Sequence, residues 1–174
     1  MITRRYRSIF ACVIMLGLAI PGAAIADNNG KGCSLLGSWF GVDTLEDKNL
    51  TGWMVTATGK SEKRGTNYFE YPNFDPTFFG YFPTAVRLSN SVGTWQRTGG
   101  NTFEYSFIGL ALDATNQLVG ILKTSGEISL SDDCNSETLT ATVYLYDPAQ
   151  GPFTDEPFQV VPFPELYGYR VQLD

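Results

Sequence analysis

Apolar and polar residues alternate with a period of two along most of the chain after residue 36, and this pattern predicts β-strands. The alternation is clearest in ETLTATVYLY at 137–146, where four aliphatic residues at odd positions alternate with threonine and tyrosine. The segment NTFEYSFIGLALD at 101–113 places Phe103, Tyr105 and Phe107 on one face, and small residues continue that face. Large residues that give way to small ones fit the taper of a small barrel interior.

Six further segments have a strand-like composition and are mostly joined by short polar links. They lie at 37–45, 50–59, 85–89, 93–98, 118–130 and 165–173. Gly99 and Gly100 predict a two-residue hairpin tip between the strands at 93–98 and 101–113. About eight strands in meander order predict an all-β fold, a single antiparallel up-and-down barrel with no boundary for a second domain.

The first 26 residues have the build of a secretory signal peptide. Three arginines between positions 4 and 7 precede a short apolar run, and Ala24 and Ala26 form an A-x-A site before Asp27. The apolar run is too short to span a membrane. We therefore expect export to remove residues 1–26 and to leave one domain, 27–174, in the periplasm or outside the cell.

The charge of this mature domain excludes several classes of partner. All 18 acidic residues but only nine of the 12 basic ones lie in it, which gives a net charge of −9. Such a surface repels the phosphate backbone, so we expect no nucleic-acid partner. Without a polybasic cluster we expect no membrane anchor either, and the size of the domain fits a monomer.

The chain has no histidine, which removes Ser–His and Cys–His nucleophile systems and imidazole metal sites. No phosphate-loop or dinucleotide fingerprint occurs, and we expect neither a cofactor nor a metal. Cys12 leaves with the signal peptide, so Cys33 and Cys134 are the pair that remains. In an exported chain such a pair predicts a disulfide.

Four short motifs resemble the calycin-type barrels, which include the lipocalins. They are LLGSWFGV near residue 40, GTWQRTGGNTFEYSF and LDATNQLVG in the middle, and YGYRVQL at the end. The middle motifs resemble those of small secreted bacterial lipocalin-like proteins of unknown function. The resemblance implies a lipocalin-like barrel over 27–174, closed at one end by Trp39 against Arg170. The second lipocalin motif, Thr-Asp-Tyr, is absent, so the resemblance implies the fold and not membership of the lipocalins.

The segment NYFEYPNFDPTFFGYFPT at 67–84 combines eight aromatic residues with three prolines. Proline lacks the N–H that a strand needs, so we expect an irregular lid over the barrel end opposite Trp39 and Arg170. This lid and the aromatic face of 101–113 would line a cavity for a small apolar molecule. The expected ligand-binding residues are Tyr68, Phe69, Tyr71, Phe74, Phe78, Phe79, Tyr81, Phe82, Phe103, Tyr105 and Phe107.

Two other functions remain open from the sequence. A cofactor-free cyclase or isomerase acting on an apolar substrate would use Arg97, Glu104 and Tyr105. A hairpin tip at Gly99–Gly100 would pair 97 with 102 and 95 with 104, which puts Arg97 and Glu104 together on the face opposite Phe103. A structural or protein-interaction module would instead have a filled barrel and exposed rings.

The segment SDDCNSE at 131–137 offers oxygen groups that suit calcium, but it lacks the EF-hand spacing. Its oxygen-bearing side chains include Asp132, Asp133, Asn135 and Glu137. A polar hairpin turn beside a disulfide accounts for the same residues. We interpret the segment as such a turn.

Overall fold

The computed structural model describes residues 32–44, 50–72, 75–78, 80–150 and 156–172. The predicted signal peptide lies outside these residues. The described part contains the strands β1 (Gly37–Thr44), β2 (Leu50–Ser61), β3 (Arg64–Glu70), β4 (Arg87–Leu88), β5 (Ser91–Arg97), β6 (Thr102–Leu112), β7 (Leu118–Leu130), β8 (Ser136–Tyr146) and β9 (Gln159–Arg170). It contains no helix long and apolar enough to cross a membrane.

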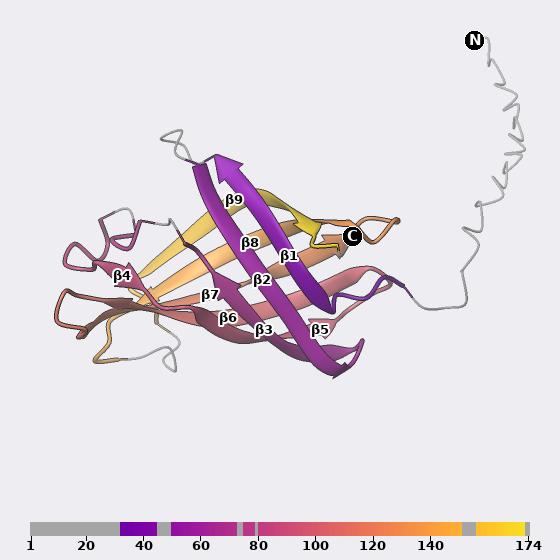
Figure 1. Ribbon diagram of the computed structural model, residues 1–174. Helices are drawn as coiled ribbons and strands as arrows, with labels where there is room; N and C mark the ends of the chain where they lie inside the picture. Colours follow the sequence, from indigo (N-terminus) through magenta and orange to yellow (C-terminus); the bar gives the residue numbers. More distant parts are fainter. Residues whose placement is uncertain (1–31, 45–49, 73–74, 79, 151–155, 173–174) are drawn as a thin grey trace, which may run out of the picture. The chain divides into compact units, whose positions relative to one another are not determined.

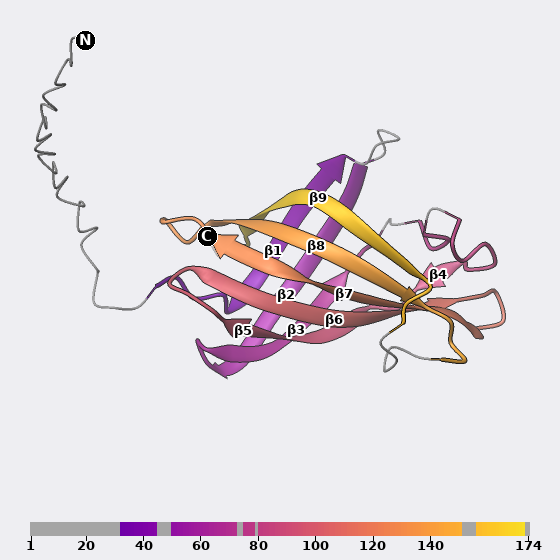
Figure 2. The same cartoon turned by 180° about the vertical axis from the view of Figure 1, so that it is seen from behind.

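Eight of these strands close into an antiparallel barrel with up-and-down connectivity. Each pairs with the next in the order β1, β2, β3, β5, β6, β7, β8, β9, and β9 returns to pair with β1. Figures 1 and 2 show this succession from indigo β1 to yellow β9. The two-residue β4 pairs with the last two residues of β6 and takes no part in the closure. The predicted all-β barrel is therefore confirmed.

The strand inventory differs from the prediction in three places, the last of which is β9, which begins at Gln159 and not at 165. Residues 67–70 belong to β3, which pairs with β2 on one side and β5 on the other, so the irregular segment begins only after Glu70. The prolines that argue against a strand all lie beyond that point. The expected strand at 85–89 shrinks to Arg87–Leu88, since the preceding residues pack against the barrel end.

The hairpin between β5 and β6 has a register one residue away from the predicted one. Arg97 pairs with Phe103 and Trp95 with Tyr105, so the connection is longer than two residues. The N–H groups of Thr98 and Gly99 both donate to the carbonyl of Thr102. Because a shift of one residue exchanges the faces of a strand, Trp95 and Arg97 lie on the same face as Phe103 and Tyr105.

Close approach of neighbouring strands in the barrel wall depends on glycine. A Cβ at Gly126 would lie 1.7 Å from the carbonyl oxygen of Thr140 on the neighbouring strand, which no side chain can tolerate. Tyr105 pairs with this glycine and donates its hydroxyl to the same carbonyl, at 3.0 Å. Glycine therefore allows the backbones of β7 and β8 to approach closely, and the paired Tyr105 spans the position.

The interior consists of two clusters, one toward each end of the barrel. The first is the larger and contains Cys33, Leu35, Trp39, Trp53, Val55, Ala57, Phe69, Trp95, Phe103, Tyr105, Phe107, Ile128, Leu130 and Leu139. The second contains Phe78, Phe82, Ala85, Ala111, Leu122, Val143 and Leu145. The inward alternation predicted for 137–146 and 101–113 is confirmed by the buried odd-numbered residues of β6 and β8.

Candidate functional site

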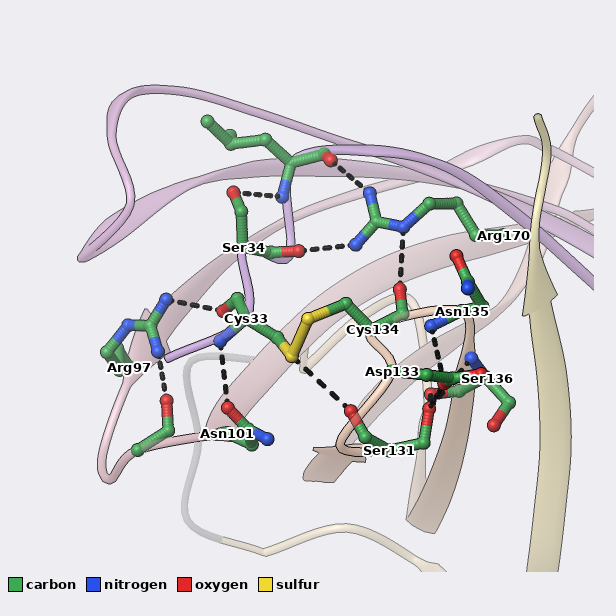
Figure 3. Close-up of a disulfide and its surroundings, with 12 residues drawn as sticks. Cys33, Ser34, Arg97, Asn101, Ser131, Asp133, Cys134, Asn135, Ser136 and Arg170 are labelled. Atoms are coloured by element: carbon green, nitrogen blue, oxygen red, sulfur yellow. Dashed lines mark hydrogen bonds between the residues drawn. A yellow bond between two sulfur atoms is a disulfide. The ribbon is translucent and has the colours of Figure 1, made fainter. Parts of the chain in front are cut away.

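One end of the barrel is closed by the segment before β1. A disulfide joins Cys33 in this segment to Cys134 in the β7–β8 turn, as predicted, and Figure 3 shows an arginine on each side of it. Arg97 donates to the carbonyls of Cys33, Glu62 and Gly100. Its guanidinium lies 4.5 Å from the ring centre of Phe103. These contacts hold the segment across the barrel end.

Arg170, at the end of β9, holds the same segment from the other side. It donates to the carbonyls of Ser34, Leu36 and Cys134 at 2.5, 2.8 and 2.8 Å. Its guanidinium lies 4.1 Å from the ring centre of Trp39, and Trp39 donates to the carbonyl of Leu35. The two arginines and the Trp39 ring serve the closure, so their role at this end is structural.

The opposite end is covered by the segment that follows β3, called the lid segment below and described at residues 75–78 and 80–86. Phe78 and Phe82 insert into the second cluster against strands β6, β7 and β8. The ring of Phe82 lies over Gly120, where a Cβ would be only 2.3 Å from the ring. Phe78 lies 6.0 Å from the ring of Phe163 on β9. The lid segment therefore connects several strands across this end.

The lid segment is built from tight turns. Asp75 accepts hydrogen bonds from the N–H and the hydroxyl of Thr77, and its carbonyl accepts one from Phe78 N–H. Phe78 itself has φ of 47°, in the left-handed region that bulky residues rarely adopt. Backbone strain of this kind is concentrated at ligand clamps and other functional positions.

A cavity of about 50 Å³ lies beneath Phe78. It is lined by Trp53, Tyr71, Phe78, Leu88, Ser89, Ser91, Phe107, Gly109, Leu122, Thr124, Ala141, Val143, Phe163 and Leu166. The lining is almost entirely apolar and contains no charged side chain. Since one water needs about 10–15 Å³, the cavity has room for roughly four water-sized groups without any movement of the lid segment.

Glu137 is a buried carboxyl that the sequence assigned to a turn. It faces the barrel interior at only 2 % exposure, and both carboxylate oxygens lack a hydrogen-bond partner among the described residues. It packs with Trp53 over Gly168. Burial raises its pKa to about 8, and the positive charge of Arg170 opposes part of that rise. Glu137 does not line the cavity, because it lies nearer the closed end.

Glu137 in turn affects Tyr105. Burial raises the pKa of the Tyr105 phenol well above its ordinary value, and the negative charge of Glu137 adds to the rise. The phenol donates to the Thr140 carbonyl, a backbone contact within the wall. Both groups therefore hold their protons at neutral pH.

The structure distributes the predicted ligand-binding residues over several environments. Tyr71, Phe78 and Phe107 line the cavity. Phe69, Phe82, Phe103 and Tyr105 are buried in the two clusters without lining it. Tyr81 is exposed, and Tyr68 points outward from β3 at 50 % exposure, because it alternates with inward Phe69. Phe74 and Phe79 lie outside the described residues.

The residues proposed for an enzyme are not brought together. Glu104 is exposed on the outer face and accepts a hydrogen bond from Gln96 at 3.1 Å. Arg97 lies at the closed end, so the predicted Arg97–Glu104 pairing on one face is wrong, for the register reason given above. Phe103 faces the interior and Glu104 faces the solvent, so the two lie on opposite faces of β6, as the alternation predicted.

Polar groups within the turn at 131–137 form hydrogen bonds with one another. Asp133 accepts hydrogen bonds from the Ser131 hydroxyl and the Asn135 N–H, which hold its pKa below the ordinary value. In the described part of the chain, no cluster of three or more His, Cys, Asp or Glu side chains could hold a metal ion. Glu137 points away from this turn into the barrel.

Sequence reasoning missed Ser91, Thr124 and Glu137. Thr124 and Glu137 carried a usable signal, because they occupy inward positions of strands whose other inward residues are apolar or small. Ser91 carried a weaker one, since its inward row on β5 contains Trp95 but also Arg97. Glu137 is two residues before Leu139 in the clearest alternating segment. Extending the period of two by one step would have placed it inside.

Comparison with known proteins gives no match: no protein-family model, no curated protein and no solved structure matches this chain. The resemblance to lipocalin-like proteins therefore consists of the short motifs and of the closed eight-stranded barrel itself. The contact of Trp39 with Arg170 that the resemblance implied is present.

Proposed function

We propose that the protein is exported and binds a small apolar molecule in the cavity beneath Phe78. The observation that carries the proposal is an uncharged, mostly hydrocarbon cavity in the barrel interior, lined by residues of both core clusters. It lies behind a buried phenylalanine with strained backbone. Barrels of eight strands commonly hold one small ligand in such a place.

The size of the cavity limits the ligand. Without rearrangement it accepts a chain of about four non-hydrogen atoms. A ring such as that of toluene, or any longer ligand, requires Phe78 to move outward, and Phe78 belongs to the lid segment and to no strand. Export is supported by the disulfide, since such bonds persist in oxidising compartments.

Acid–base catalysis in the cavity has less support. Glu137 is the buried carboxyl of the described interior, and it lies outside the cavity lining. Tyr105 uses its hydroxyl in the barrel wall. The binding function therefore accounts for the lining better than the cyclase or isomerase alternative.

Titration with toluene, followed by calorimetry and by methyl NMR, tests the proposal. We expect saturable binding, with the largest shifts at Leu122 and Val143 in the lining. Ala141→Leu fills the cavity and should abolish binding, whereas Ala114→Leu adds the same side chain on an exposed turn and should not. Absence of binding to the folded wild type, or equal binding by folded Ala141→Leu, would overturn it and favour an interaction module.

A further inference from the structure

Two hydroxyls in the cavity lining differ from all its other polar groups. Ser91 and Thr124 are each 4 % exposed, and no hydrogen bond of either side chain occurs among the residues that the structure describes. The Glu137 carboxylate oxygens have almost no accessible surface, whereas the Ser91 and Thr124 hydroxyl oxygens keep some. A buried hydroxyl without a partner is costly, and such groups are normally satisfied.

Ser89 provides the contrast within the same lining. Its hydroxyl accepts a hydrogen bond from Leu110 N–H at 3.0 Å and donates one to the carbonyl of Asn90 at 2.9 Å. Ser89 therefore has a structural role, at the point where the chain passes from β4 to β5. No comparable partner accounts for Ser91 or Thr124.

The local backbone keeps space beside Ser91. Its hydroxyl oxygen lies 2.6 Å from the position that a Cβ would take at Gly109, which also lines the cavity. Any larger residue at position 109 would press on this hydroxyl. The glycine leaves the Ser91 oxygen accessible from within the barrel.

Thr124 is the single hydroxyl-bearing residue on the inward row of β7. The other inward residues from 120 to 130 are Gly120, Leu122, Gly126, Ile128 and Leu130. Thr124 pairs with Phe107 on one side and Val143 on the other, so its surroundings are hydrocarbon. Valine would fill this position with the same shape and without a polar group.

We propose that Ser91 and Thr124 anchor one uncharged polar group, a hydroxyl or a carbonyl, on a ligand that is otherwise a single ring or a short hydrocarbon chain. This inference rests on the proposed binding function and specifies its ligand class. The group is uncharged because the lining holds no charged side chain, and Arg97 and Arg170 serve the closed end. A buried charge without a partner would be excluded from such a cavity.

Phenol and toluene test the anchor because they have nearly the same shape, and phenol carries a hydroxyl where toluene carries a methyl group. Each compound has a partition coefficient between water and hydrocarbon. In the wild type, we expect the ratio of the phenol to the toluene binding constant to exceed the ratio of these partition coefficients by about tenfold or more. This comparison needs no variant. Ser91→Ala and Thr124→Val should each weaken phenol binding about fivefold and leave toluene binding unchanged or stronger.

Two matched variants complete the experiment. Thr124→Ser keeps the hydroxyl that Thr124→Val removes, and it should keep the phenol selectivity of the wild type. Ser106→Ala, on the outer face of β6, should change neither affinity. A wild type that binds both compounds in their transfer ratio would overturn the anchor while leaving the binding function intact. So would phenol selectivity that survives in folded Ser91→Ala and Thr124→Val. Failure of both compounds to bind would overturn the proposed function itself.

Discussion

The guanidinium of Arg170 lies 4.1 Å from the ring centre of Trp39 and donates to three backbone carbonyls. The two residues come from the last and first strands, which pair to close the barrel. Their contact therefore joins the ends of the sheet at the point where closure depends on it. Two of the carbonyls, those of Ser34 and Leu36, belong to the segment that covers this end, so one side chain performs both tasks.

Replacing Arg170 by Ala should destabilise the barrel by about 2–4 kcal/mol, because three carbonyls lose a charged donor and Trp39 loses its cation–π partner. Urea unfolding measures the change. Arg87→Ala is a suitable control, since Arg87 is exposed and bonds only Asn116 among the described residues. Its effect should stay within about 0.5 kcal/mol, and equal losses in the two variants would contradict the assigned role.

Reduction of the Cys33–Cys134 disulfide, or its removal by Cys33→Ser, should lower the free energy of unfolding by about 2–5 kcal/mol. The bond spans 101 residues, so it restricts the unfolded chain over most of the domain. Thermal melts with and without reductant measure the loss. Free thiols in freshly exported protein, detected by non-reducing peptide mapping, would show that the bond does not form in the cell.

Phe78→Leu should speed toluene dissociation severalfold, because the shorter side chain covers the cavity less completely. The stability loss should be about 1–2 kcal/mol, since most of the apolar volume is kept. Tyr81→Leu changes a neighbouring exposed ring and should leave the dissociation rate unchanged. Unchanged dissociation from Phe78→Leu would show that this ring is a core residue without a gating role.

Stability should decrease as the pH rises from about 4.5 to about 8 because of Glu137. The pKa of its carboxyl is near 4.5 in the unfolded chain and about 8 in the fold, so the folded state binds the proton more tightly. The stabilisation is complete below pH 4.5 and is lost as the pH passes the folded value, a change of up to about 5 kcal/mol. Tyr105 and Arg170 are the ionisable groups that interact with it.

Urea unfolding at pH 5 and pH 8.5 measures this dependence, and Glu137→Gln should remove most of it while preserving the shape of the side chain. An unchanged slope in Glu137→Gln would mean that another group causes the effect. Asp113 and Asp133 titrate with lowered pKa values, so any contribution of theirs falls at more acidic pH and has the opposite sign.

Secretion should release a chain that begins at Asp27. The prediction follows from the A-x-A site at Ala24 and Ala26 after a short apolar run. N-terminal sequencing of the exported protein measures it directly. Recovery of a folded, oxidised protein that retains Met1 would contradict cleavage.

The sequence by itself determined the barrel and its disulfide. Period-two alternation is a local property, and it located most strands because side chains of a strand point to opposite faces at every step. It also placed Phe103 and Tyr105 inside, since the larger apolar face must leave water. The pairing of Cys33 with Cys134 followed because the predicted cleavage after Ala26 leaves them as a pair.

Only the tertiary structure decided the register of the β5–β6 hairpin and, with it, the positions of Arg97 and Glu104. One residue more in the turn exchanges the two faces, and two adjacent glycines are compatible with either length. The same limit applies to the site. Thr124 and Glu137 are isolated polar residues within apolar rows, and the importance of these two and of Ser91 depends on which buried groups of other strands surround them. Contacts between residues far apart in the chain set that environment, and no local pattern carries it.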